Sequence, residues 1–342
     1  MKIGNVDLGS RPLFLAPMED VTDPSFRLLC KRFGADMVYT EFINSDGLIR
    51  DASSTLAKLK ISDAERPVGI QLYGHIIESM VEAAKIATEA NPEVIDINFG
   101  CPVKKIANRG AGSGIMKDVP KMVEMTRQIV AATHLPVTVK TRLGWDDESK
   151  NIVEIAERLQ DVGIVALTIH GRTRAQLYRG VADWTLIGEV KNNPRMTIPI
   201  IGNGDIDSPE KAKNMFDNYG VDGIMIGRAT YGRPWIFKEI KHFLQTGERM
   251  KPLSVEEKVA LAKEHLYLAI AEKGERRAIL EMRRHYTCYF KALPHFKELR
   301  LKLVTENSPE NVTNLLSEVA EKYAGFVQDE SINPSPWSNG TF

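Results

Sequence analysis

The chain has 342 residues, and its 45 Lys+Arg balance 45 Asp+Glu, so the formal net charge is zero. Hydrophobic residues make up 43% of it, which excludes intrinsic disorder. The three cysteines, Cys30, Cys101 and Cys288, are too few and too scattered for a disulfide framework or a cysteine-based zinc site. We therefore expect a cytoplasmic protein without a metal.

The first apolar run, residues 13–16, lies between Pro12 and Pro17 and is too short for a secretory signal. No other run approaches the roughly 18 apolar residues that a membrane helix needs. We therefore expect no membrane association.

Eight short apolar runs, rich in β-branched residues, recur through the first two thirds of the chain, and each ends in glycine, proline or polar residues. They are Leu13–Met18, Met37–Phe42, Val68–Tyr73, Val94–Phe99, Val137–Arg142, Ala166–His170, Ile198–Gly202 and Gly223–Ile226. The clearest helical patterns between them are Ile76–Ala90, Val119–Ala132, Ser149–Val162, Trp184–Asn192, Pro209–Tyr219 and Pro234–Gln245. This alternation predicts an α/β fold, a (β/α)8 TIM barrel, with an open doubly wound sheet as the alternative.

Beyond Pro252 the strand signal stops, and helical patterns follow at Ser254–Ala271, Arg276–Leu293 and Pro309–Tyr323. We therefore predict a catalytic barrel domain over residues 1–250 and a small C-terminal helical domain over residues 251–330. Residues 331–342 read as a frayed tail.

The carboxyl ends of the strands are expected to hold the chemistry, because parallel barrels gather their active-site residues there. In chain order the residues at these ends are Ala16-Pro17-Met18, Glu41, Gln71, Asn98 with Gly100-Cys101-Pro102, Lys140 with Arg142, His170-Gly171-Arg172, Asn203-Gly204-Asp205 and Gly227-Arg228. So many polar residues at one end predict a functional site.

The last two strand ends, Asn203-Gly204-Asp205 and Gly227-Arg228, fall where such barrels often hold a phosphate. Glycine lets backbone N–H groups approach the oxygens, and Arg228 can add a charge-assisted pair. The alternative is two turns that need glycine for their backbone conformation.

Lys140 is a cation at the end of an otherwise buried strand, so it needs a partner. That partner is either a bound anion or electron-rich ring, or a carboxylate such as Glu41 or Asp96. Gln71 and Asn98 can each donate and accept, which suits the edge of a planar heterocycle or, alternatively, the pairing of buried backbone groups.

Cys101 lies between Gly100 and Pro102 at the end of the fourth strand, whereas Cys30 lies within an apolar stretch. A thiol with a pKa near about 8.5 is mostly protonated at neutral pH, so Cys101 can serve as a proton donor. The alternative is a buried, inert cysteine.

The glycine-rich segment 108–116 does not match a dinucleotide fingerprint, because its glycines are spaced two apart and it starts well after the strand. With Lys104, Lys105 and Arg109 beside it, we expect a flexible loop that closes over an anionic substrate.

Together these motifs resemble the tRNA-dihydrouridine synthases, most closely the bacterial B-type enzymes. The matching pieces are Ala16-Pro17-Met18 with Val21-Thr22-Asp23, Gln71-Leu72, residues 96–102, Val139-Lys140-Thr141-Arg142, residues 170–174, Asn203-Gly204-Asp205 and Gly227-Arg228. The resemblance implies an FMN-dependent reduction of the C5–C6 double bond of a uridine in the tRNA D-loop, with NADPH as the reductant.

The resemblance also implies roles for individual residues. Cys101 would be the proton donor. The FMN-binding residues would be Ala16, Pro17, Met18, Gln71, Lys140, His170, Asn203, Gly204, Asp205, Gly227 and Arg228. Separately, we expect Asn98, Arg142, Arg172, Arg283 and Arg284 to bind the substrate. We expect a monomer whose partners are tRNA and NAD(P)H.

The helical tail offers a basic surface, with nine Lys or Arg against three Glu between Lys273 and Lys302. Tyr286, Tyr289 and Phe290 lie among these charges and could stack on bases. The alternative is a solvated helix face over an aromatic core. Since the resemblance implies a helical RNA-binding domain, we favour RNA binding.

Two other functions compete with this interpretation. An FMN-dependent dihydroorotate or dihydropyrimidine dehydrogenase, acting on a free pyrimidine, would share the phosphate loops but would not need a basic tail. A non-enzymatic RNA-binding protein would need neither Cys101 nor Lys140 nor the phosphate loops.

Overall fold

The structure is a computed structural model that describes residues 1–326, so the predicted frayed tail, residues 331–342, lies outside the described residues. The main sheet is built from β3 (Leu13–Leu15), β4 (Val38–Tyr39), β5 (Ile43–Asn44), β6 (Val68–Tyr73), β7 (Val94–Asn98), β8 (Val137–Arg142), β9 (Ala166–His170), β10 (Ile200–Asn203) and β11 (Gly223–Ile226). All its neighbours are parallel, in the order β3-β11-β10-β9-β8-β7-β6-β4.

The sheet closes on itself between β3 and β4. Leu15 donates its backbone N–H to the carbonyl of Met37 at 3.0 Å, and Phe14 forms a parallel bridge with Met37. The predicted TIM barrel is therefore confirmed, and the doubly wound alternative is wrong. The second predicted strand, Met37–Phe42, is divided into β4 and β5, both paired with β6.

Alternate residues of the strands point to opposite sides of the barrel wall. The outward set, such as Ile95, Ile97 and Val139, joins the main apolar core with the surrounding helices. The inward set forms a lower apolar layer, which includes Phe14 and Met225, and continues in polar residues at the carboxyl ends. The same alternation therefore builds both the core and the site.

The amino-terminal end of the barrel is closed by an antiparallel hairpin that the sequence analysis did not predict, β1 (Lys2–Ile3) with β2 (Val6–Asp7). Ile3 is fully buried and packs in the lower apolar layer with Leu8. The hairpin therefore fills the end of the barrel opposite the predicted site.

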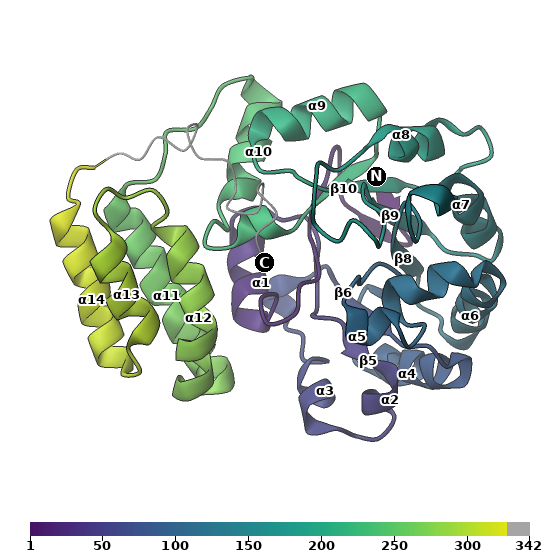
Figure 1. Cartoon of the computed structure of the whole chain (residues 1–342), viewed down its shortest axis with the longest axis horizontal. Coiled ribbons are helices and arrows are strands. Elements are labelled where there is room, and N and C mark those ends of the chain that lie inside the picture. Colours follow the sequence, from purple (N-terminus) through teal and green to yellow (C-terminus); the bar gives the residue numbers. More distant parts are fainter. Residues whose placement is uncertain (327–342) are drawn as a thin grey trace.

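The helices of the barrel domain surround the sheet (Figure 1). They are α1 (Pro24–Arg32), α2 (Ser45–Leu48), α3 (Ser53–Ala57), α4 (Ile77–Glu89), α5 (Lys104–Ala107), α6 (Val119–Ala132), α7 (Ile152–Asp161), α8 (Thr185–Asn192), α9 (Pro209–Tyr219) and α10 (Ile236–Thr246). The sequence analysis missed α1, although Asp23 followed by Pro24 is a helix start signal. The Asp23 carboxylate caps α1 by accepting the N–H of Phe26 at 2.9 Å.

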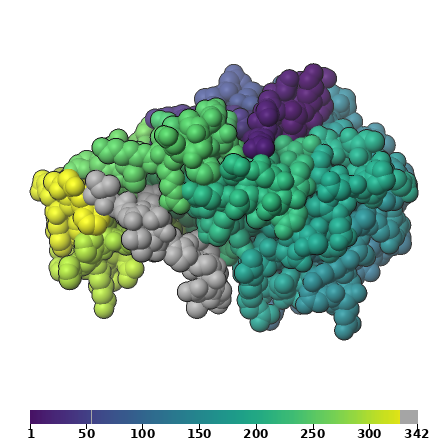
Figure 2. Space-filling view, turned by 90° about the horizontal axis from the view of Figure 1, so that it is seen from above, coloured from purple at the N-terminus to yellow at the C-terminus, as the bar shows by residue number. Residues whose placement is uncertain are grey.

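Four helices form the C-terminal domain, a separate lobe beside the barrel (Figures 1 and 2). They are α11 (Val255–Lys273), α12 (Glu275–Tyr289), α13 (Lys297–Thr305) and α14 (Pro309–Lys322). The sequence analysis did not predict α13. Trp235, which precedes α10, belongs to the apolar core of these helices, so a side chain of the barrel domain extends into the core of the helical domain.

A cluster of aromatic rings and histidines also joins the two domains. Phe26 of α1 stacks on His265 of α11 at a centroid distance of 5.4 Å and lies 4.9 Å from His285 of α12. The two histidine rings are 4.5 Å apart. Both histidines are buried, so the interface encloses two titratable groups.

Within residues 1–326, no helix has the length and apolar content needed to cross a bilayer.

Candidate active site

A cavity of about 470 Å³ opens at the carboxyl ends of the barrel strands. Its walls include most of the predicted site residues: Ala16, Pro17, Met18, Asn98, Cys101, Lys140, Arg142, His170, Arg172, Asn203, Gly204, Asp205, Gly227 and Arg228. Strand register brings them together, because Asn98 lies beside Lys140, and His170 lies beside both Arg142 and Asn203. Gln71 does not line the cavity. It is fully buried behind Asn98.

Cys101 lies in the cavity wall with 8% of its surface exposed. Its backbone is held on both sides, because its N–H donates to Asn98 Oδ1 at 2.9 Å and its carbonyl accepts from Ser113 Oγ at 2.8 Å. Burial raises the pKa of the Cys101 thiol above its ordinary value. The thiol is therefore protonated at neutral pH, as a proton donor must be.

Lys140 reaches into the same cavity and donates to Asn203 Oδ1 at 3.2 Å. Burial, together with the nearby Arg142, lowers the Lys140 pKa to about 8. Neither carboxylate that the sequence analysis considered forms an ion pair with it: Glu41 pairs with Lys58, and Asp96 bonds to Gln71 and Thr138. Among the described residues no carboxylate forms an ion pair with Lys140, although the charge of Asp96 acts on it, so this cation remains available to a bound ligand.

The carboxylate of Asp205, which follows β10, binds two arginines, Arg172 after β9 and Arg228 after β11. Asp205 accepts two hydrogen bonds from Arg172, at 2.9 and 2.6 Å, and one from Arg228 at 3.0 Å. Burial alone would raise the pKa of Asp205, but these hydrogen bonds and charges hold it below its usual value. Asp205 is therefore an anion that is already paired, and it holds both arginine side chains in place.

His170 lies beside these arginines, with its Nε2 atom 3.3 Å from Arg172 Nη1. Burial, followed by the charges of Arg142 and Lys140, lowers the His170 pKa well below its ordinary value. The imidazole is therefore neutral, and it adds no positive charge to the site.

Arg142 and Arg172, predicted to bind substrate, donate most of their N–H groups to the protein. Arg142 donates to the carbonyls of Gly100, Thr173 and Leu177 at 2.7, 3.0 and 2.9 Å. Arg172 donates to the carbonyls of Arg179 and Gly180 at 3.1 and 2.6 Å. The two arginines thus fix the segment that follows β9 against the Cys101 loop.

Tyr178, at the tip of that segment, was missed by the sequence analysis. Its ring centroid lies 4.9 Å from the Arg228 guanidinium carbon and 5.6 Å from that of Arg142, and it lines the cavity. Tyr178 could have been proposed as a site residue from the sequence, because it is an aromatic residue in a polar loop that follows a strand end.

The glycine-rich segment is not the flexible loop that the sequence analysis expected. Its first part follows α5, and its second part forms a 3-10 helix, Gly112–Lys117, whose first five residues are buried. Ser113 in this helix bonds the Cys101 carbonyl, whereas Lys104 and Lys105 on α5 are exposed. The segment therefore holds the backbone of Cys101 in place, while the preceding helix α5 exposes its two lysines to solvent.

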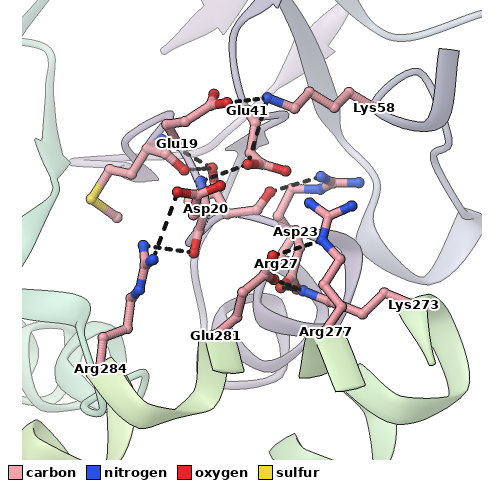
Figure 3. A network of polar contacts seen from close by, with 12 residues as sticks. Glu19, Asp20, Asp23, Arg27, Glu41, Lys58, Lys273, Arg277, Glu281 and Arg284 are labelled. Carbon is pink, nitrogen blue, oxygen red and sulfur yellow. Dashed lines mark hydrogen bonds and ion pairs between the residues drawn. The ribbon is translucent and has the colours of Figure 1, made fainter. Parts of the chain in front are cut away.

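The helical domain contacts the loop that follows β3, as Figure 3 shows. Arg284 of α12 donates to the carbonyl of Asp20 at 3.0 Å, and Lys273 pairs with Asp23 and with Glu281. Because Ala16 to Met18 of the same loop line the cavity, this contact sets the position of the helical domain relative to the site.

The structure bears on two predictions for the tail. Tyr286, Tyr289 and Phe290 are at most 1% exposed in the core of the helical domain, so the prediction that they stack on bases is wrong. Arg283 donates to the carbonyl of Glu306 and to Asn307 Oδ1 at 3.1 and 2.9 Å. Arg283 and Arg284 are therefore both held by the protein, and neither lines the cavity.

Comparison with known proteins identifies the family. The dihydrouridine synthase family model matches residues 14–324. A tRNA-dihydrouridine synthase B of Pseudomonas putida is 42% identical over 303 residues, 88% of this chain and 89% of that protein. A probable tRNA-dihydrouridine synthase of Rickettsia conorii is 40% identical over 333 residues, 97% of this chain and 99% of that protein.

Among solved structures, morphinone reductase in complex with tetrahydroNAD superposes with a TM-score of 0.52 at 12% identity, covering 74% of this chain and 91% of that one. At this identity the likeness supports the barrel fold alone. The sequence matches extend over almost the whole chain, and the chain belongs to the dihydrouridine synthase family.

Proposed function

We propose that the cavity binds FMN and that the protein uses it, with NADPH as the reductant, to reduce the C5–C6 double bond of a uridine in the tRNA D-loop. The observation that carries this proposal is that one cavity holds two groups: a protonated Cys101 thiol and a Lys140 that forms no ion pair with a carboxylate among residues 1–326.

The side chains of the cavity suit a ligand with one planar ring and one phosphate. Lys140 would lie at the ring, where a cation favours the electron-rich reduced form. Arg228, oriented by Asp205, and the backbone of Gly227 would hold the phosphate. Ala16 to Met18 would cover one side of the ring. When bound, FMN would supply the hydride that reaches C6 of uracil.

The proton that completes the reduction would come from Cys101. As negative charge develops on C5 and O4 of uracil, the S–H bond breaks and the proton forms a new C–H bond at C5. The thiolate that remains regains a proton from water. Asn98 and Ser113 fix the Cys101 backbone during this transfer, so that the thiol is already directed at the cavity.

The substrate has to be an unstacked nucleotide, because the thiol lies inside a barrel and a base within a duplex cannot reach it. Exposed cations of both domains could hold the surrounding phosphates: Lys104 and Lys105 on α5, and Arg276, Lys297, Arg300 and Lys302 on the helical domain. This surface distinguishes the proposal from a dehydrogenase that acts on a free pyrimidine.

The test is an anaerobic absorbance experiment on the full chain loaded with FMN. NADPH should bleach the flavin bands, and unmodified tRNA should restore them while dihydrouridine accumulates. Free uridine at the same concentration serves as the control and should leave the bands bleached. Recovery with free uridine, or failure of the protein to bind FMN, would overturn the proposal.

A further inference from the structure

A chain of buried hydrogen bonds leads from the interior of the barrel to the Cys101 loop. Asp96 Oδ2 accepts from Gln71 Nε2 at 2.6 Å, and Gln71 Oε1 accepts from Asn98 Nδ2 at 2.8 Å. Asn98 Oδ1 then accepts the N–H groups of Gly100 and Cys101 at 3.0 and 2.9 Å. The proposed mechanism uses the last of these bonds but gives no role to Asp96.

The direction of this chain is fixed at both ends. An ionised carboxylate can only accept, so Asp96 obliges Gln71 to turn its NH2 group inward and its oxygen toward Asn98. Backbone N–H groups can only donate, so the Cys101 loop obliges Asn98 to present its oxygen. Only one orientation of the Gln71 and Asn98 amides pairs both the Asp96 carboxylate and the N–H groups of the Cys101 loop, and it is the orientation observed.

Water does not compete for these groups, because Gln71, Asp96 and Asn98 are 0%, 1% and 6% exposed. If the Gln71 amide turned over, two oxygens would face each other at Asp96 and two NH2 groups would face each other at Asn98. Each contact would leave a buried polar group unpaired, which is costly in an apolar interior. The carboxylate therefore selects one orientation for both amides.

The second oxygen of Asp96 has its own partner, since Thr138 donates its hydroxyl to Oδ1 at 2.5 Å. Burial raises the Asp96 pKa to about 6, so the group is mainly ionised at neutral pH and remains an acceptor. Strand register supports the arrangement, because Asp96 lies directly beside Gln71 on β6 and Thr138 on β8.

We propose that Asp96 is a positioning residue for Cys101: it accepts from Gln71, thereby orients Asn98, and so fixes the backbone that directs the thiol into the cavity. This role rests on the proposed function of Cys101 as the proton donor. It predicts that the effect of Asp96 on Cys101 requires a hydrogen-bond acceptor at position 96, and does not require its negative charge.

Four nearly isosteric variants separate these possibilities. Asp96→Leu removes the acceptor, and Gln71→Met removes the link between Asp96 and Asn98. Asp96→Asn keeps an acceptor, because its amide oxygen can face Gln71 while its NH2 group faces the Thr138 hydroxyl. Thr138→Val is the matched control, since it deletes a hydrogen bond of the same carboxylate outside the chain to Cys101.

The first readout is the rate at which iodoacetamide alkylates Cys101 in flavin-free protein, followed by peptide mass spectrometry with Cys288 as the internal reference. Asp96→Leu and Gln71→Met should change the Cys101 rate by about tenfold, the effect of one lost buried hydrogen bond. Asp96→Asn and Thr138→Val should remain near the original rate. Melting temperatures show whether each variant is folded.

The second readout is turnover of the FMN-loaded protein, where kcat should fall in Asp96→Leu and Gln71→Met while KM for tRNA stays unchanged. An unchanged Cys101 alkylation rate in Gln71→Met would overturn the proposal even if Asp96→Leu did not fold. Equal effects of Asp96→Leu and Thr138→Val, or of Asp96→Leu and Asp96→Asn, would also overturn it. Alkylation needs neither flavin nor tRNA, so its outcome is separate from any failure of the proposed function.

Discussion

Asp23, at the start of α1 in the barrel domain, and Lys273, at the end of α11 in the helical domain, form a buried ion pair across the domain interface. Their side chains are only 11% and 9% exposed, and Lys273 also pairs with Glu281 at 2.5 Å. Burial alone would raise the Asp23 pKa, but Lys273 and the hydrogen bonds of the carboxylate hold it well below its usual range. The buried carboxylate of the barrel domain thus has its counterion, Lys273, in the helical domain.

Substituting Lys273→Met should be strongly destabilising, because it leaves a buried carboxylate without its cation. We expect a loss of about 3–5 kcal/mol in the free energy of unfolding, measured by urea denaturation. Arg277→Met is the control, since Arg277 is 56% exposed and pairs with the same Glu281. It should cost less than about 1 kcal/mol. Equal losses in the two variants would contradict the importance of the buried pair.

Stability should fall as the pH drops below 6.5, because three buried histidines with lowered pKa values, His170 in the cavity and two at the domain interface, outweigh the opposite effect of Asp96, whose pKa is raised to about 6. Burial lowers the His265 pKa from 6.5 to about 4 and lowers the His285 pKa well below 6.5. Between pH 6.5 and 4 the unfolded chain therefore binds protons that the folded chain does not. Each histidine then contributes a loss of up to about 1.4 kcal/mol per pH unit.

The measurement is the urea midpoint at pH 7.5, 6.0 and 5.0. Asp23 adds little to this slope, because a carboxylate of ordinary pKa 3.8 is already ionised in both states above pH 5. His285→Gln should make the slope shallower, whereas His295→Gln, on an exposed residue, should leave it as it was. A midpoint independent of pH would show that the buried histidines do not titrate as described.

Cys101→Ala should retain FMN and tRNA binding and lose turnover by about 10²–10⁴-fold, the usual contribution of a positioned proton donor. Because burial raises the thiol pKa, alkylation of Cys101 should also accelerate with increasing pH above neutrality. Cys288→Ser is the control and should turn over normally. Turnover of Cys101→Ala close to that of the original protein would remove the proton-donor role.

Charge reversal of exposed cations should weaken tRNA binding. Arg276→Glu and Lys105→Glu should each lower affinity and reduce the slope of log K against log salt by about 0.7–0.9, one phosphate contact. The measurement is a filter-binding titration at several salt concentrations. Lys85→Glu, on α4, changes an equally exposed cation and should bind normally. If all three variants behaved alike, net charge and not a defined surface would govern binding.

The barrel and the composition of the cavity could be predicted from the sequence because their signals are local. Lys140, His170, Asn203 and Gly227 each lie at or next to the carboxyl end of a recognisable strand, and a closed parallel barrel has to bring such residues together at one end. No distance between strands had to be known for that prediction.

The contacts of these residues could not be predicted, because they depend on the path of the chain in space. The arginines at positions 142 and 172 look available in the sequence, yet each donates two hydrogen bonds to carbonyls of a loop with no pattern of its own. Similarly, Tyr286 has the same helical spacing whether it faces RNA or a core. Its burial is decided by packing between the helices of the C-terminal domain.

The β1–β2 hairpin described above has a kinetic consequence. Since Ile3 and Leu8 fill the amino-terminal end of the barrel, molecules reach Cys101 from the carboxyl end. Under the proposed function, the nicotinamide reductant and the tRNA would both enter through this one opening and would occupy it in turn. We therefore expect double-reciprocal plots at several fixed NADPH concentrations to be parallel lines, the pattern of an enzyme that releases its first product before its second substrate enters.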